Sequence, residues 1–229
     1  KDFFFFEKKD VRSVMGALVY LVKTRLPEYI GASPFEIQVL TPMRKGELGL
    51  EHLNEVLQYY LNPASESKKE KEGRTGVFRE GDKVLQVQNN YKLEWKITNA
   101  KGFSIEEGLG VFNGDMGIIK QINTYSERIT VVFDENREAE YPFSSLDELE
   151  LAYAITIHKS QGSEYPAVVL PLLSGPPILC NRNLLYTAIT RAQKCVAIAG
   201  RQSMVEQMIH NETEQKRYSG LNDCLKEGL

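Results

Sequence analysis

The stretch from Thr156 to Glu164 carries the side chains best suited to chemistry in this sequence. It reads Thr-Ile-His-Lys-Ser-Gln-Gly-Ser-Glu and overlaps the end of an apolar segment, Leu151 to Ile157, that predicts a strand. Open α/β sheets bind ligands at the carboxyl ends of their strands. Small hydroxyls, histidine and lysine at such an edge suit phosphate oxygens rather than base edges. The candidates for contact with a nucleic-acid backbone are Thr156, His158, Lys159 and Ser160.

Gly162 and Glu164 lie in the same stretch and suit a nucleotide. Because Gly162 has no Cβ, its main chain can approach a phosphate closely. The Glu164 carboxylate is suited to orienting a ribose hydroxyl or a water molecule. The alternative is a solvated loop that happens to contain a glycine. The number of donors directly after an apolar strand favours a phosphate-facing site.

The segment from Leu184 to Ala192 predicts a helix that carries an arginine near its end. Its apolar face consists of Leu184, Leu185, Ala188, Ile189 and Ala192, with Asn183 as a candidate N-cap. Arg191 and Thr187 are one turn apart and lie off that face. An arginine in such a place is usually solvated or paired with a carboxylate. The functional alternative is a guanidinium whose planar fork pairs with phosphate oxygens.

A second arginine follows a short apolar strand near the other end of the sequence. Ile37 to Leu40 predicts a buried strand, and Thr-Pro-Met-Arg-Lys-Gly follows it at positions 41–46. A helix comes next, with an apolar face made of Leu50, Leu53, Leu57 and Leu61. Arg44 is therefore predicted at another strand exit.

The elements that must hold these residues alternate between strand and helix. Phe3 to Phe6 predicts a buried strand, and a helix follows, with Asp10 as N-cap and an end near Pro27. Val168 to Leu170 and Cys195 to Ala199 predict further apolar strands. Strand, helix and strand at this spacing predict a parallel sheet. The polar segment 62–76 lacks periodicity and predicts an exposed, mobile linker without chemistry.

A different pattern occupies residues 81–149, where short strands recur at roughly ten-residue spacing. The expected strands are 84–87, 117–122, 128–133 and 138–141, which suggest a five- or six-stranded SH3-like barrel. Asn113-Gly114 is expected to form a hairpin turn. Exposed aromatic side chains can stack on bases, although burial in the core is the expectation for each of Tyr91, Trp95, Phe103 and Tyr125.

Composition limits the classes of function. A net charge of −3 gives no general support to nucleic-acid binding, so any such contact must be local. The three cysteines and three histidines show no zinc-binding spacing, so no metal site and reduced thiols are expected. No apolar run approaches the roughly 20 residues of a membrane span, and a cytoplasmic protein without membrane contact is expected.

Taken in order, these segments resemble superfamily 1 nucleic-acid helicases. Positions 41–46 resemble motif IV, positions 156–164 motif V and positions 184–192 motif VI. Phe-Asn-Gly-Asp-Met-Gly at 112–117 is similar to the barrel insert of RecD-like helicases, although 93–109 is extra length. The whole resembles the C-terminal part of a RecD-like superfamily 1B DNA helicase, a family also called exodeoxyribonuclease V alpha subunit.

The resemblance implies a fold with three parts. Residues 1–79 and 150–229 would form the second RecA-like motor domain, and residues 80–149 an inserted SH3-like barrel. Arg44 and Arg191 would face the γ-phosphate of ATP, with Gly162 and Glu164 also at the nucleotide. The residues 156, 158, 159 and 160 would hold single-stranded DNA during 5′→3′ translocation.

The resemblance also implies partners outside this sequence. No Gly-x-x-x-x-Gly-Lys-[Ser/Thr] occurs in the 229 residues, so an N-terminal motor domain is expected to bind most of the ATP and Mg²⁺. The chain is thus expected to be half of a motor, inactive alone, with other recombination subunits as further partners. The alternative is a non-catalytic module that binds DNA or a partner. A nuclease has little support, because no carboxylate cluster suits two metal ions.

Overall fold

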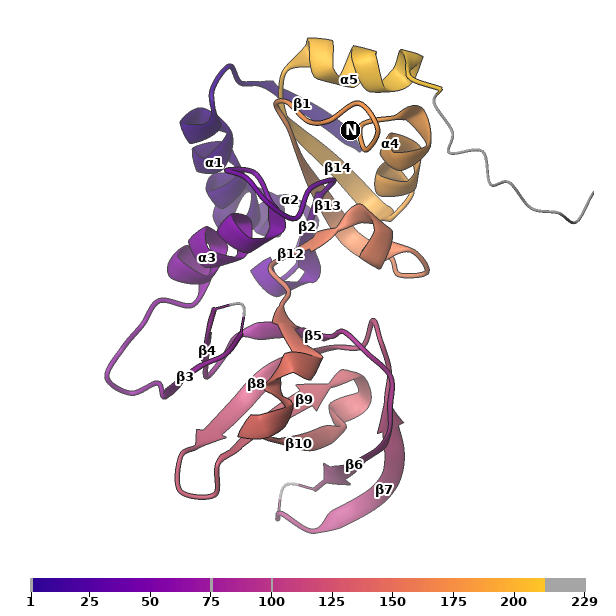
Figure 1. Ribbon diagram of the computed structural model, residues 1–229. Helices are drawn as coiled ribbons and strands as arrows, with labels where there is room; N and C mark the ends of the chain where they lie inside the picture. The colour runs from indigo at the N-terminus through magenta and orange to yellow at the C-terminus, as the bar shows by residue number, and fades with distance from the viewer. Residues whose placement is uncertain (1, 75, 100, 213–229) are drawn as a thin grey trace, which may run out of the picture.

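The computed structural model describes residues 2–74, 76–99 and 101–212, which form two large sheets. One is a five-stranded parallel sheet with helices on both faces. The other is a seven-stranded antiparallel sheet that lies below it in Figure 1. The chain leaves the parallel unit after α3 (Leu50–Leu61) and returns at β12 (Ala154–Thr156). The predicted α/β domain with an inserted β unit is therefore confirmed.

The parallel sheet supplies the frame for the candidate residues. Its strands, in spatial order, are β1 (Phe3–Glu7), β14 (Ala192–Gly200), β13 (Tyr165–Leu172), β2 (Ile37–Thr41) and β12. All four neighbouring pairs are parallel, as the alternation of strands and helices predicts. β1 is an edge strand, and Phe3 is 47% exposed, so the expectation of a fully buried phenylalanine run is wrong. An edge position leaves one side of a strand without a neighbour.

Alternate residues of the central strands point to opposite faces of this sheet. Val169 and Ala197 belong to the core under the N-terminal helices, whereas Val168 and Ile198 belong to the core under α4 (Arg182–Ile189) and α5 (Gln202–His210). Helices cover both faces, so the strands are apolar throughout rather than alternating. This two-sided burial accounts for the continuous apolar runs in the sequence.

The first helical stretch is longer than its proline suggests. Asp10 caps α1 (Val11–Tyr20), because its Oδ1 accepts from Ser13 N at 2.9 Å. The predicted end near Pro27 is wrong: a π-helical turn, η1 (Leu21–Arg25), leads into α2 (Leu26–Ile30). Pro27 then falls in the first turn of α2, where a missing N–H is tolerated. Among the described residues, no helix is long and apolar enough to cross a membrane.

The antiparallel sheet has seven strands, so the expected five or six is wrong. In spatial order they are β11 (Leu149–Leu151), β5 (Lys83–Gln86), β8 (Met116–Asn123), β9 (Arg128–Phe133), β10 (Glu138–Pro142), β6 (Asn90–Thr98) and β7 (Ser104–Val111). The long β6–β7 hairpin is the part that sequence reasoning missed. In β6, Leu93, Trp95 and Ile97 alternate with charged residues, but most of β7 is exposed and two glycines interrupt its pattern. Short helical turns η2 (Pro34–Glu36), η3 (Asp134–Asn136) and η4 (Phe143–Glu148) complete the connections.

The strand expected from Leu151 to Ile157 is two strands in two different sheets. Leu151 ends β11 and pairs with Val84 of the antiparallel sheet. Ala154 begins β12 and pairs with Val39 of the parallel sheet. Periodicity could not reveal this break, because residues 151–157 form a nearly continuous apolar run and only Ala152 and Tyr153 separate the two strands. The chain therefore crosses between the units immediately before the Thr156 turn.

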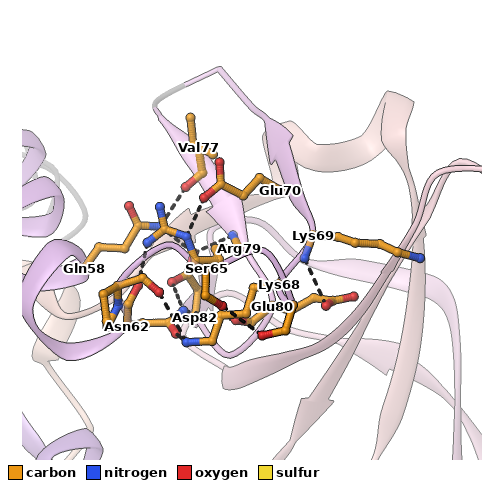
Figure 2. A network of polar contacts seen from close by, with 12 residues as sticks. Gln58, Asn62, Ser65, Lys68, Lys69, Glu70, Val77, Arg79, Glu80 and Asp82 are labelled. Atoms are coloured by element: carbon orange, nitrogen blue, oxygen red, sulfur yellow. Dashed lines mark hydrogen bonds and ion pairs between the residues drawn. The ribbon is translucent and has the colours of Figure 1, made fainter.

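The joint between the two units, residues 62–74 and 76–82, contains a short pair of strands, where the sequence predicted an exposed, mobile linker at 62–76. β3 (Glu70–Glu72) pairs with β4 (Val77–Arg79) within this joint. Its centre is the fully buried Asp82, which accepts from Gln58 Nε2 at 2.6 Å, Asn62 Nδ2 at 2.7 Å and Tyr153 OH at 2.8 Å. Figure 2 shows part of this network. Burial raises the pKa of Asp82, and these hydrogen bonds oppose the rise.

Candidate functional site

The turn after β12 is held from within by two of the predicted DNA-contacting residues. Thr156 caps η5 (Ile157–Ser160), and its Oγ1 accepts from Lys159 N at 3.4 Å. The Ser160 hydroxyl donates to Ile157 O at 2.7 Å. Thr156 is 8% exposed and Ser160 is fully buried. In this structure both hydroxyls shape the turn instead of facing solvent.

His158 and Lys159 are the members of that turn whose side chains reach the surface. His158 is exposed. Lys159 Nζ lies 2.9 Å from Glu150 Oε2, and its side chain is 24% exposed. Thr156 and Ser160 therefore stabilise the turn, and His158 and Lys159 are the residues whose side chains this turn exposes. The sequence pattern alone does not separate these two roles.

Gly162 and Glu164 continue the turn toward β13. Gly162 has a φ of +89°, a conformation that strongly favours glycine, and it is exposed. A Cβ added at Gly162 would meet no atom within 4 Å, so the space beside its main chain is open. Glu164 is exposed, and its Oε2 accepts from Gln193 Nε2 at 3.4 Å. Both residues are accessible to a ligand.

The sequence predicted Arg191 within a helix, but in the structure Arg191 lies beyond the end of α4. The helix ends at Ile189, and its N-cap is Asn181 rather than Asn183, with Oδ1 accepting from Leu184 N at 2.9 Å. Asn183 lies two positions after the cap, inside the first turn of α4. Arg191 therefore occupies the turn that leads into β14.

The Arg191 guanidinium joins this turn to the Gly162 turn. Its Nη1 donates to Ser163 O at 3.1 Å, and its Nε donates to Thr187 O at 3.3 Å. A third bond runs from Nη2 to Thr190 Oγ1 at 3.3 Å. All three acceptors are backbone or hydroxyl oxygens, whereas the sequence suggested solvent or a carboxylate as the usual partner of such an arginine. Because a guanidinium has five N–H donors, these three bonds orient it and leave two donors for a ligand.

Arg44 lies in the loop after β2 and forms an ion pair. Its Nη2 is 2.9 Å from Glu150 Oε1, and its side chain is 49% exposed. Glu150 therefore accepts from both Arg44 and Lys159, one on each oxygen. Burial raises the pKa of Glu150, but the hydrogen bonds from Lys159 and Arg44 outweigh burial and hold the pKa below its usual range. Sequence reasoning missed Glu150, which stands 106 residues from Arg44.

The backbones of the two candidate arginines lie at opposite ends of the parallel strands. Arg191 precedes the first residue of β14, which pairs with the first residue of β13. Arg44 follows the last residue of β2, whose pairing with β13 puts it near the end of that strand. Because a strand rises about 3.3 Å per residue, the start of β14 and the end of β2 lie about 20 Å apart along the strand direction. The structure thus groups Arg191 with Gly162 and Glu164, and Arg44 with Lys159.

The antiparallel unit contributes a turn close to the start of β13. Asn113-Gly114 forms the predicted turn, with Gly114 at a φ of +105° and its N donating to Gln86 O at 2.9 Å. This turn and the Ser163–Pro166 segment line a pocket of about 620 Å³. The expected burial of the aromatic side chains is wrong for Tyr91, Phe103 and Tyr125, which are 68%, 67% and 97% exposed, whereas Trp95 is half-buried.

The described side chains include no metal-binding cluster, and the cysteines among them are buried. Within residues 2–74, 76–99 and 101–212, no group of three or more His, Cys, Asp or Glu side chains is placed to hold a metal ion. Cys180 and Cys195 are free and buried, and burial raises the pKa of both thiols. Cys224 lies outside the described residues.

Two family models match this chain in consecutive segments. Residues 53–133 match the SH3 domain of ATP-dependent RecD-like DNA helicases. Residues 151–199 match the UvrD-like helicase C-terminal domain. The first match covers most of the antiparallel sheet, and the second covers β12, η5, β13, α4 and most of β14.

Curated relatives cover much of this chain but are far longer. The ATP-dependent RecD2 DNA helicase of Deinococcus radiodurans is 38% identical over 167 residues, which are 73% of this chain and 20% of that protein. The RecBCD enzyme subunit RecD of Mycolicibacterium smegmatis is 30% identical over 191 residues, 83% of this chain and 29% of that protein. This chain thus spans less than a third of either relative.

A solved structure resembles the chain along nearly its whole length. It is that of a Pif1 helicase from Bacteroides in complex with ADP-AlF3 and single-stranded DNA. The likeness covers 97% of this chain and 54% of that one, with a TM-score of 0.49 and 16% identity.

Proposed function

The chain belongs to the RecD-like DNA helicases, and on that premise we propose that it is the C-terminal motor part of an ATP-dependent 5′→3′ DNA helicase. In this proposal the parallel unit is the second RecA-like motor domain, and the SH3-like unit that interrupts it extends through β11 to Leu151 instead of ending at residue 149. A first motor domain of the full-length protein, outside these residues, binds most of the ATP and Mg²⁺. The full-length protein would act in the cytoplasm, and other recombination subunits would be further partners.

One observation carries this proposal: Arg191 ties the end of α4 to the turn that contains Gly162 and Glu164. The bond from Arg191 Nη1 to Ser163 O places an oriented guanidinium beside an open, glycine-containing turn. A guanidinium so held is suited to stabilising charge that develops on a transferred phosphoryl group. Arg191 is the proposed arginine finger, and Gly162 and Glu164 are the proposed nucleotide contacts.

The Thr156 turn is the proposed grip on single-stranded DNA. His158 and Lys159 would contact the phosphate backbone, because their side chains reach the surface. Thr156 and Ser160 would act by holding the turn that presents them. Arg44 would meet a phosphate from its own end of the sheet. When the two motor domains close around ATP, the Thr156 turn would then move along the DNA strand that it contacts.

A second candidate function rests on the exposed aromatic side chains of the antiparallel unit. Tyr91, Phe103 and Tyr125 are suited to stacking on bases or to packing against a partner protein. Without catalysis in the full-length protein, the chain would then be a module that binds DNA or a partner.

ATP turnover discriminates these functions. The full-length protein should hydrolyse ATP faster when single-stranded DNA is present. The 229-residue chain alone should not hydrolyse ATP, because no Walker A loop occurs in it. A full-length protein without DNA-stimulated turnover would refute the motor and leave the binding module. Turnover that scales with the concentration of the highly purified 229-residue chain would refute its role as half of a motor.

A further inference from the structure

Glu150 holds two cations that come from loops far apart in the sequence. Its Oε1 lies 2.9 Å from Arg44 Nη2, and its Oε2 lies 2.9 Å from Lys159 Nζ. The Glu150 side chain is 18% exposed and belongs to β11, the last strand of the SH3-like unit. A single planar anion therefore sits between the loop after β2 and the turn after β12.

The Glu150 carboxylate accepts the kind of contacts that a phosphate group also accepts. Two oxygens of one anion each accept a charge-assisted hydrogen bond, and both donors belong to side chains that pair well with phosphate. Arg44 and Glu150 also line a pocket of about 930 Å³, so an incoming group has access to this pair. The Arg44 side chain is about half exposed, which leaves part of its donor fork free.

We propose that Arg44 and Lys159 form one phosphate-binding site, and that the Glu150 carboxylate occupies it until a phosphate group displaces it. This inference rests on the proposed function, because it assumes that the Thr156 turn meets a phosphate-bearing ligand. It assigns Arg44 to the same phosphate as Lys159, instead of the γ-phosphate that the resemblance implies for both Arg44 and Arg191. It also links phosphate binding to the SH3-like unit, since β11 pairs with β5 of that unit.

Displacement has a measurable consequence. Glu150→Gln keeps the shape of the side chain but removes the competing charge, so both cations become available to phosphate. On a single strand, each cation that neutralises a phosphate steepens the plot of log affinity against log salt by about 0.7, so two steepen it by about 1.4. We expect binding about fivefold tighter at low salt.

The test compares variants of the 229-residue chain. Binding of a 15-nucleotide oligo-dT and of ATP is measured by fluorescence anisotropy and calorimetry at several salt concentrations. The matched control is Glu140→Gln, which makes the same change in net charge. Glu140 pairs with Arg128 at 3.6 Å in an exposed ion pair of the SH3-like unit. Thermal melting of every variant checks the fold, and Glu150→Asp, too short to span both cations, serves if Glu150→Gln is unstable.

The expected result is a gain in Glu150→Gln that Glu140→Gln lacks and that disappears when Lys159→Gln or Arg44→Gln is added. A gain with oligo-dT alone identifies a backbone phosphate, and a gain with ATP alone identifies a nucleotide phosphate. Equal binding by the wild-type chain and Glu150→Gln overturns this inference and leaves the proposed function standing. Weaker binding by a well-folded Glu150→Gln also overturns it, because Glu150 would then position the cations. No binding of either probe by any variant counts against both.

Discussion

Replacing Arg191 by alanine in the full-length protein should separate two contributions of one guanidinium. The substitution removes the bonds to Ser163 O, Thr187 O and Thr190 Oγ1. Each such bond contributes about 0.5–1.5 kcal/mol, and part exposure of the side chain puts the total near 2 kcal/mol. For a protein unit of this size, that loss lowers Tm by about 4–8 °C.

The effect on catalysis should be far larger than this loss of stability explains. Loss of an arginine finger lowers turnover by about 10³–10⁵-fold. At a temperature well below Tm, a loss of about 2 kcal/mol leaves nearly all of the protein folded, so stability accounts for less than a twofold change. Arg191→Lys should rescue little, because one ammonium cannot span the carbonyls of Ser163 and Thr187.

The matched control is Thr190→Ala, which changes stability but keeps the guanidinium. Thr190 Oγ1 accepts from Arg191 and donates to Thr187 O at 3.0 Å, so its loss removes two bonds of the same turn. The assay is steady-state ATP turnover at saturating single-stranded DNA, with thermal melting of each variant. Turnover of Arg191→Ala within tenfold of wild type would reduce Arg191 to a cap of α4. An unchanged Tm would refute the bonding argument.

Two further predictions concern the Thr156 turn and a buried lysine. His158→Ala should weaken single-strand binding by the full-length protein for all sequences without lowering Tm, whereas Ser160→Ala should lower Tm, because its buried hydroxyl bonds Ile157 O. Anisotropy and melting check this, and a sequence-specific loss for His158→Ala would contradict it. Burial lowers the pKa of Lys83 to about 8, so between about pH 8 and pH 10.5 the unfolded chain holds a proton that the folded chain has lost. The free energy of unfolding of wild type should therefore rise with pH relative to Lys83→Met in that window, and urea unfolding that shows a constant difference would refute the shift.

Features that depend on neighbouring residues were accessible from the sequence. The apolar run of Val168 to Leu170 indicated a strand covered on both faces, and that strand lies at the centre of the parallel sheet. Asp10 was recognisable as an N-cap, and Asn113-Gly114 as a turn, because each is set by a few adjacent positions. The order of the three helicase-like segments was likewise visible in the chain.

Features that depend on the path of the chain were not accessible. The sequence marked Thr156, His158, Lys159 and Ser160 as one group, but only the fold divides them into buried and outward-facing side chains. The β6–β7 hairpin was not predicted, although Leu93, Trp95 and Ile97 alternate with charged residues in β6, because most of β7 is exposed and carries no matching pattern.

The pairing of Glu150 with Arg44 shows the same limit most clearly. The two residues are 106 positions apart, and six of the seven strands of the inserted sheet lie between them in the sequence. Helix and strand propensities act over a few residues, whereas this contact requires β11 to return beside the loop that follows β2. The sequence determined which side chains are able to bind phosphate. Only the tertiary structure decided which of them meet, because the meeting depends on how two separately packed sheets are joined.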